Sequence, residues 1–201
     1  MASVRNLVAE ANSLRAGQWQ VGIGGDLHGK TLGILGLGSI GQKVAGFGKA
    51  FGMQVIAWSE NLTPERAAES GVTWVSKREL FEQADILSVH LVLSDRSRGL
   101  VDAQALGWMK QTARLVNTSR GPIVDEHALA QALAKGQLAG AALDVYAEEP
   151  LPADHPFRTL PNVLATPHVG YVSQQNYRVF YGQMIEDILA WAKGAPVRVL
   201  G

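Results

Sequence analysis

The apolar residues of this chain alternate between short continuous runs and longer stretches with helical spacing. The first run, Thr31–Leu35, leads into a glycine-rich turn. In the stretch that follows, apolar residues recur three or four positions apart and share one helical face, and Gly52 ends the pattern. Those apolar residues are Ile40, Val44, Phe47 and Phe51. A second apolar run, Gln54–Trp58, completes a strand–helix–strand unit of the roughly 30 residues that such a unit needs.

The alternation continues through most of the chain. Short apolar runs at 86–91, 114–118, 139–145 and 163–166 are typical of buried parallel strands. Helical patterns lie between them, most clearly at 126–135. Strands that alternate with helices predict an α/β fold with a doubly wound parallel sheet.

Both ends of the chain predict helices. Residues 1–17 show helical spacing up to Gly17, and a glycine-rich connector follows at 22–29. Near the other end, 174–193 predicts a long amphipathic helix with one apolar stripe. The stripe consists of Tyr177, Tyr181, Met184, Ile188 and Trp191.

Composition narrows the class of protein. The 201 residues are 47% hydrophobic and 18% charged, which is ordinary for a soluble globular domain. Lys and Arg balance Asp and Glu at 18 each, so no net charge favours nucleic acid or an anionic membrane. No apolar run approaches the ~18 residues of a membrane span, and the N-terminus has no secretory signal. The lack of cysteine excludes disulfides and thiolate metal sites and suits a reducing compartment. We therefore expect a cytoplasmic protein without a metal, nucleic-acid or membrane partner.

The turn after the first strand has the spacing of a dinucleotide-binding loop. Gly36 permits a tight turn, Gly38 lets the backbone approach a pyrophosphate, and Gly41 lets the helix pack closely on the strand. Ser39 and Ile40 would offer their N–H groups at the start of the helix, where the helix dipole favours phosphate. The context of strand, loop and helix predicts a Rossmann NAD(P)-binding domain.

Two residues are candidates for holding the adenosine ribose. Dinucleotide folds place an acid near the end of the second strand, where Ser59 lies 18 residues beyond Gly41 and Glu60 comes next. Glu60, if turned inward, would accept from the ribose hydroxyls and repel a 2′-phosphate; alternatively it is a solvated loop acid. Since no basic residue adjoins Ser59, we expect NAD in preference to NADP.

Three later segments carry a family resemblance. They read LVNTSRG at 115–121, ALDVY at 142–146 running to EEP at 148–150, and TPHVG at 166–170. In this order and spacing they resemble the signature segments of the D-isomer-specific 2-hydroxyacid dehydrogenases, and the resemblance runs from about residue 5 to about residue 190. It implies an NAD-dependent oxidoreductase that transfers hydride between the nicotinamide and a small 2-keto or 2-hydroxy acid.

The resemblance assigns catalytic roles to Arg120, Glu149 and His168. Arg120 offers a planar fork for a substrate carboxylate. His168 can supply a proton, since histidine titrates near neutral pH, and Glu149 would orient its ring. Taken singly, these residues could be a surface cation, a charged turn and a loop histidine. All three follow predicted strand ends, where open α/β sheets bind ligands.

The resemblance also implies further cofactor contacts. Asp144 matches the acceptor for the nicotinamide carboxamide, and Thr118 and Gly170 match backbone neighbours of the nicotinamide. The other matching positions are His90, Leu91, Val92 and Ser97 beside the adenosine half, and Ser119, Arg120 and His168 beside the nicotinamide. Two positions depart from the family pattern: Val92 stands where Pro is common, and Tyr171 where a second Gly is frequent.

The organisation of the whole protein follows from the same resemblance. Family members have a substrate domain mostly N-terminal to the glycine loop, but only 35 residues precede Gly36 here. We expect residues 1–201 to be a single dinucleotide-binding domain with linking helices at both ends, and the substrate domain to be absent. The segment 16–19 matches an extension that embraces a partner, so a homodimer is expected with Trp19 as an anchor. Alternatively, Trp19 packs on its own domain.

Two other functions stay open at this point. One is an NAD(H)-sensing, corepressor-like protein, and the other is a stand-alone dinucleotide-binding module without catalysis. Glyoxylate, hydroxypyruvate, phosphohydroxypyruvate and D-lactate are all compatible with the residues as substrates.

Overall fold

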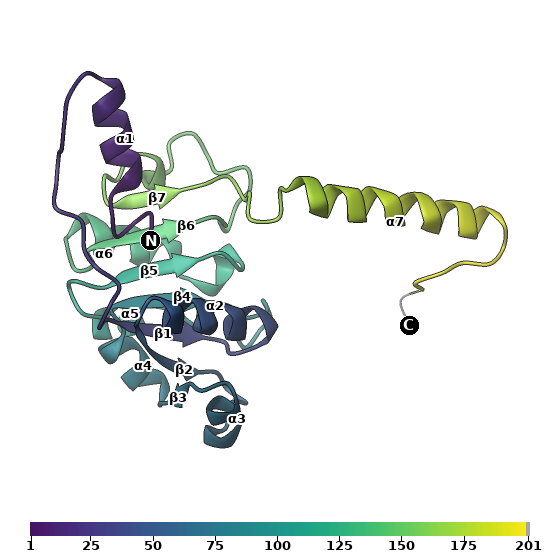
Figure 1. Ribbon diagram of the computed structural model, residues 1–201, viewed down its shortest axis with the longest axis horizontal. Helices are drawn as coiled ribbons and strands as arrows, with labels where there is room; N and C mark the ends of the chain where they lie inside the picture. Colours follow the sequence, from purple (N-terminus) through teal and green to yellow (C-terminus); the bar gives the residue numbers. More distant parts are fainter. Residues whose placement is uncertain (200–201) are drawn as a thin grey trace. The chain divides into compact units, whose positions relative to one another are not determined.

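The computed structural model describes residues 1–199, in which seven strands form one sheet (Figure 1). The strands are β1 (Thr31–Leu35), β2 (Gln54–Trp58), β3 (Thr73–Trp74), β4 (Ile86–Val89), β5 (Arg114–Asn117), β6 (Gly140–Leu143) and β7 (Val163–Ala165). Every neighbouring pair is parallel, and the order is β3-β2-β1-β4-β5-β6-β7. The predicted doubly wound α/β fold is confirmed. The direction of winding reverses between β1 and β4, which is where such sheets bind ligands.

The chain divides into two compact units, Met1–Pro167 and His168–Gly201. The first unit contains the sheet, six α-helices and two 3-10 turns among its described residues. The α-helices are α1 (Leu7–Arg15), α2 (Ser39–Ala50), α3 (Pro64–Glu69), α4 (Lys77–Gln83), α5 (Ala103–Trp108) and α6 (Glu126–Ala134), and the turns are η1 (Gly121–Ile123) and η2 (Pro156–Arg158). The second unit contains α7 (Gln174–Ala192), and the chain after it folds back so that Arg198 pairs with Glu186 and Asp187. Each unit therefore has internal contacts of its own.

Polar residues fix the starts of several helices. Ser76 and Glu79 form a reciprocal capping box at α4, in which each side chain accepts from the backbone N–H of the other residue. Asp102 and Asp125 accept from backbone N–H groups in the first turns of α5 and α6. Each such cap contributes about 1 kcal/mol to the stability of its helix.

The sheet is buried on both faces. Ile34 belongs to a cluster with residues of α2 and β2, whereas the next residue, Leu35, belongs to the cluster formed with α4, α5 and α6. Successive side chains of a strand point to opposite faces, so a strand covered on both sides needs apolar residues at consecutive positions. This requirement explains the continuous apolar runs in the sequence.

Helix α2 packs on the sheet through a different face from the apolar one that its sequence displays. Gly41, Ala45 and Gly48 are buried, while Ile40 and Phe47 are 66% and 65% exposed. A Cβ at Gly48 would lie 2.5 Å from Leu32 Cδ2, so the helix approaches the sheet too closely for a larger residue. Small residues therefore define the packed face, and the large apolar side chains point away from the sheet.

Asp85 joins the start of β1 to β4. Its Oδ2 accepts from the Thr31 N–H at 2.8 Å, and its Oδ1 lies 2.9 Å from Lys110 Nζ. Burial raises the pKa of the Asp85 carboxyl, but the Thr31 hydrogen bond and Lys110 outweigh it, so the pKa is lowered.

We expect Asp85→Asn to lower the free energy of unfolding at pH 7 by about 1–3 kcal/mol. Because the folded-state pKa of Asp85 lies below its unfolded value, its stabilisation is present above pH ~3.9 and is lost as the pH falls further. Urea unfolding at pH 7 and pH 3 should therefore show a smaller pH dependence in the variant than in the wild type. An equal pH dependence in both would contradict this role.

Candidate cofactor and catalytic site

The glycine loop has the geometry of a pyrophosphate cradle. Gly36 has a φ of +104°, and a Cβ there would lie 2.9 Å from the carbonyl carbon of His90. A Cβ at Gly41 would lie 2.1 Å from the Gly36 oxygen. At Gly38, in contrast, no atom lies within 4 Å of the position a Cβ would take. Packing therefore requires glycine at positions 36 and 41, whereas Gly38 leaves the backbone open to a ligand. This arrangement fits a dinucleotide phosphate group.

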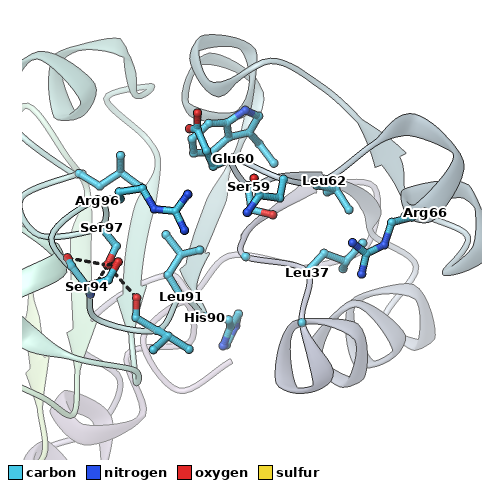
Figure 2. Close-up of a pocket in the computed structure, with 16 residues that line it drawn as sticks. Leu37, Ser59, Glu60, Leu62, Arg66, His90, Leu91, Ser94, Arg96 and Ser97 are labelled. Atoms are coloured by element: carbon cyan, nitrogen blue, oxygen red, sulfur yellow. Dashed lines mark hydrogen bonds between the residues drawn. The ribbon is translucent and has the colours of Figure 1, made fainter.

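A pocket of about 360 Å³ opens beside this loop (Figure 2). It lies where β1, β2 and β4 end, at the reversal of the strand order. Of the residues proposed from the sequence, eight line it: Gly36, Gly38, Ser59, Glu60, His90, Leu91, Val92 and Ser97. Ser39 and Ile40 lie beside it as the exposed first residues of α2, and Gly41 is buried behind them.

The loop after β4 is held by its own hydrogen bonds. The buried Ser97 hydroxyl donates to the Val92 carbonyl at 2.7 Å and accepts from the Ser94 N–H at 2.8 Å. Ser97 therefore shapes the loop. The His90 ring lies 2.8 Å from the Ser88 hydroxyl, and burial lowers the pKa of His90, which favours its neutral form.

Two arginines that were not predicted from the sequence also line the pocket. Arg66 comes from α3 and Arg96 from the loop after β4, and both side chains are exposed. Ser59, directly after β2, is half-buried, and Glu60 is exposed. The expected preference for NAD was based on the lack of a basic residue next to Ser59 in the sequence, and the fold supplies such residues from other segments.

The loop that carries Arg120 is organised by Asn117, the buried last residue of β5. Its Nδ2 donates to the Arg120 carbonyl at 2.9 Å, and its Oδ1 accepts from the N–H and hydroxyl of Ser119 at 3.1 and 3.0 Å. The Arg120 guanidinium donates to the Ser119 carbonyl at 2.6 Å and is exposed. Thr118, in the same loop, is also exposed.

The Arg120 loop packs directly on the segment that carries Glu149. A Cβ at Gly121 would lie 1.9 Å from the carbonyl carbon of Tyr146, so the two backbones touch. Glu149 Oε1 accepts from the Tyr146 N–H at 2.9 Å, and Glu126 Oε1 accepts from the Ala147 N–H at 2.7 Å. Two of the three predicted catalytic residues thus belong to loops in contact.

Glu126 supports the Glu149 segment from α6. Burial and the negative charge of Glu149 raise the pKa of Glu126, although the Ala147 hydrogen bond and His155 act in the opposite direction. Glu126 Oε2 lies 3.7 Å from His155 Nε2. Neither Asn117 nor Glu126 was singled out from the sequence, because their roles depend on contacts between distant segments.

Asp144 is buried just after β6, and its Oδ1 accepts from the Thr166 hydroxyl at 2.5 Å. Tyr146 adds a second link, since its hydroxyl donates to the Thr166 carbonyl at 2.9 Å. These contacts fix the start of the TPHVG segment at the end of β7. They hold a carboxylate in place at the edge of the sheet where the glycine loop also lies.

His168 begins the second unit and has a φ of +53°, which non-glycine residues rarely adopt. Its ring contacts Tyr171 edge to face, with centroids 5.3 Å apart and an interplanar angle of 89°. Gly170 lies between these two residues in the sequence. Tyr171, which departs from the family pattern, is therefore a direct neighbour of the predicted proton donor.

Residues 1–199 contain neither a candidate metal site nor a candidate membrane span. No cluster of three or more His, Cys, Asp or Glu side chains there could hold a metal ion. No helix in that range is long and apolar enough to cross a membrane.

Comparison with known proteins places the chain in a family. Residues 1–170 match the family model for the D-isomer specific 2-hydroxyacid dehydrogenase, NAD binding domain. The chain is 41% identical to a glyoxylate reductase of Aeropyrum pernix, over 96% of this chain and 61% of that protein. It is 40% identical to a D-3-phosphoglycerate dehydrogenase of Bacillus subtilis, over 98% of this chain and 38% of that protein.

Solved structures agree with these relatives. A phosphoglycerate oxidoreductase of Vibrio cholerae superposes with a TM-score of 0.92 at 41% identity, covering 96% of this chain and 64% of that one. The chain thus belongs to the D-isomer specific 2-hydroxyacid dehydrogenase family and is an NAD-binding domain of it. It spans about three fifths of the glyoxylate reductase and about two fifths of the phosphoglycerate dehydrogenase. The alternative of a cofactor sensor gains no support from these relatives.

Proposed function

We propose that the protein containing this domain is an NAD(H)-dependent oxidoreductase that interconverts a small 2-keto acid and the D-isomer of the 2-hydroxy acid. The observation that carries the proposal is the shared edge of the sheet. The open glycine loop after β1 and the touching loops of Arg120 and Glu149 after β5 and β6 all lie at the carboxyl ends of parallel strands. That edge is where doubly wound sheets bind their ligands.

The residues of this chain have distinct proposed roles. When bound, NAD(H) supplies the hydride; the glycine loop holds its phosphates and Asp144 accepts from its carboxamide. The Arg120 guanidinium binds the substrate carboxylate, and Asn117 and Ser119 keep the Arg120 loop in shape. His168 donates the proton to the substrate oxygen during reduction, and the role of Glu149 is to orient the His168 ring.

The substrate class is tested by incubating the whole protein that contains this domain with NADH and a panel of glyoxylate, hydroxypyruvate, phosphohydroxypyruvate and pyruvate; residues 1–201 alone are expected to bind NADH but scarcely to turn over any of them. We expect NADH oxidation that depends on at least one of these keto acids. A parallel NADH titration separates catalysis from binding. Tight NADH binding with no oxidation by any member of the panel would overturn the proposed reaction and leave the cofactor site standing.

Glu149→Gln should shift the pH dependence of the reaction. A carboxylate stabilises a protonated imidazole, and an amide does not. The alkaline limb of the pH–rate profile for keto-acid reduction should therefore move to lower pH by about one to three units. Glu148→Gln, one residue earlier and also exposed, is the matched control and should leave the profile in place. A profile unchanged by Glu149→Gln would remove Glu149 from this role.

We also propose a cytoplasmic homodimer, because the lack of cysteine suits a reducing compartment and segment 16–19 matches an extension that embraces a partner. Trp19 is 75% exposed and Ile23 98% exposed, so these side chains do not pack on their own unit. Sedimentation at micromolar concentration should show a dimer, and Trp19→Ser should weaken it. Trp74→Ser, at a partly exposed tryptophan on the edge strand β3, should leave the dimer intact. A wild-type monomer at that concentration would refute the dimer.

A further inference from the structure

The pocket beside the glycine loop contains more positive than negative charge. Its charged lining residues are Glu60, Arg66 and Arg96. His90, also in the lining, is favoured in its neutral form by burial. Within the part of the chain that the structure describes, neither guanidinium makes a hydrogen bond or ion pair. Figure 2 shows Ser59 drawn between the two arginines. Two cations are thus available to an anionic ligand group in this pocket.

The position of Ser59 indicates which group that is. In dinucleotide folds, the residue at the end of the second strand is the one that meets the ribose 2′ position. An acid there binds the 2′-hydroxyl of NAD and repels a 2′-phosphate, while a nearby arginine accommodates that phosphate. Here β2 ends at Trp58, and the next residue is the uncharged Ser59. The charge that would exclude a 2′-phosphate is missing from this position.

Glu60 is a weak substitute for the missing acid. Its side chain is exposed, so water and salt screen its charge. Arginine, in contrast, binds phosphate through two parallel hydrogen bonds, and such charge-assisted bonds are about twice as strong as neutral ones. All three side chains are exposed, so water and salt screen them alike, and the two unpaired arginines outnumber the single carboxylate.

We propose that this pocket binds the 2′-phosphate of NADP(H), with Ser59, Arg66 and Arg96 as its ligands, so that the domain accepts NADP(H) as well as NAD(H). The inference rests on the proposed function, because it takes this pocket to be the adenosine site of the cofactor. It adds NADP(H) to the NAD(H) binding that the family model supports.

The test compares two nicotinamide-free probes, ADP-ribose and 2′-phospho-ADP-ribose, by calorimetric titration. We expect their Kd values to lie within about tenfold of each other. Arg66→Gln and Arg96→Gln should each raise the Kd of 2′-phospho-ADP-ribose by at least about tenfold and leave that of ADP-ribose nearly unchanged. Arg98→Gln is the matched control, since Arg98 lies in the same loop as Arg96 and does not line the pocket. It should change neither Kd.

Unchanged ADP-ribose binding also shows that the variants are folded. A Kd for 2′-phospho-ADP-ribose more than tenfold above that for ADP-ribose in the wild type would overturn the proposal. So would arginine variants that leave 2′-phospho-ADP-ribose binding intact or weaken both probes equally. If neither probe binds, the pocket is not the cofactor site, and the proposed function fails together with this inference.

Discussion

Removing the imidazole of His168 is expected to lower turnover by roughly 10²–10⁴-fold, the usual contribution of a positioned acid–base group. NAD(H) affinity should stay nearly unchanged, because the proposed phosphate and ribose contacts come from other residues. The backbone at His168 has a positive φ, which asparagine tolerates better than most residues. His168→Asn therefore removes the proton donor with little backbone strain and is preferable to His168→Ala.

Steady-state kinetics of His168→Asn measures the loss of turnover, and an NADH titration of the same variant measures its cofactor affinity. His127→Asn is the matched control, since His127 is exposed on α6 and its ring contacts Gln131 of the same helix. It should retain turnover. If His168→Asn also retains wild-type turnover, the proton donor is another residue.

The second large effect is expected at Gly38. Because no atom lies within 4 Å of a Cβ built there, Gly38→Val should fold normally. The added side chain would occupy the space that the cofactor phosphates need, and the hydrogen bonds from the loop to those phosphates would be lost. We expect NADH affinity to fall roughly 100-fold, which corresponds to ~3 kcal/mol of binding free energy.

Gly46→Ala provides the control for the Gly38 experiment. Gly46 also has open space around its Cβ position, but it is exposed within α2 and away from the pocket lining. NADH affinity should be unchanged in this variant, and thermal unfolding should show both variants folded. Wild-type affinity in a folded Gly38→Val protein would mean that the phosphates bind elsewhere.

The regular part of the fold was predictable because its physical cause is local. Continuous apolar runs predict strands that are covered on both faces, and the runs at β1 and β2 match the observed bounds. The strand predicted at 86–91 ends instead at Val89. Residues 90 and 91 belong to the loop after β4 that lines the pocket. β3 was missed because it has only two residues, both exposed.

The packing of α2 could not be predicted from hydrophobicity. The pattern indicated a face of large residues such as Phe47, whereas the packed face consists of Gly41, Ala45 and Gly48. Close approach to the strand needs small side chains, and this requirement depends on a distance that periodicity does not encode. The glycine motif itself was the only local sign of it.

The sequence predicted the parts of the site that follow strand ends, but not the side chains that other segments bring to it. The glycine loop and the loops of Arg120 and Glu149 follow strand ends, so their meeting at one edge follows from a parallel sheet. Arg66 and Arg96 were missed because they come to the pocket from a short helix and an irregular loop. Basic residues shortly after the second and fourth strands were the signal that could have identified them.

The most direct test of the proposed reaction follows the transferred hydrogen. The protein that contains this domain is incubated with NADH carrying deuterium at both C4 positions, together with whichever of hydroxypyruvate, phosphohydroxypyruvate and pyruvate supports the fastest NADH oxidation, since the product of glyoxylate has no stereocentre. The product is analysed by mass spectrometry and chiral chromatography. We predict a 2-hydroxy acid of D configuration with one deuterium at C2. A product of L configuration, or one without deuterium at C2, would contradict the assignment of this domain to D-specific hydride transfer.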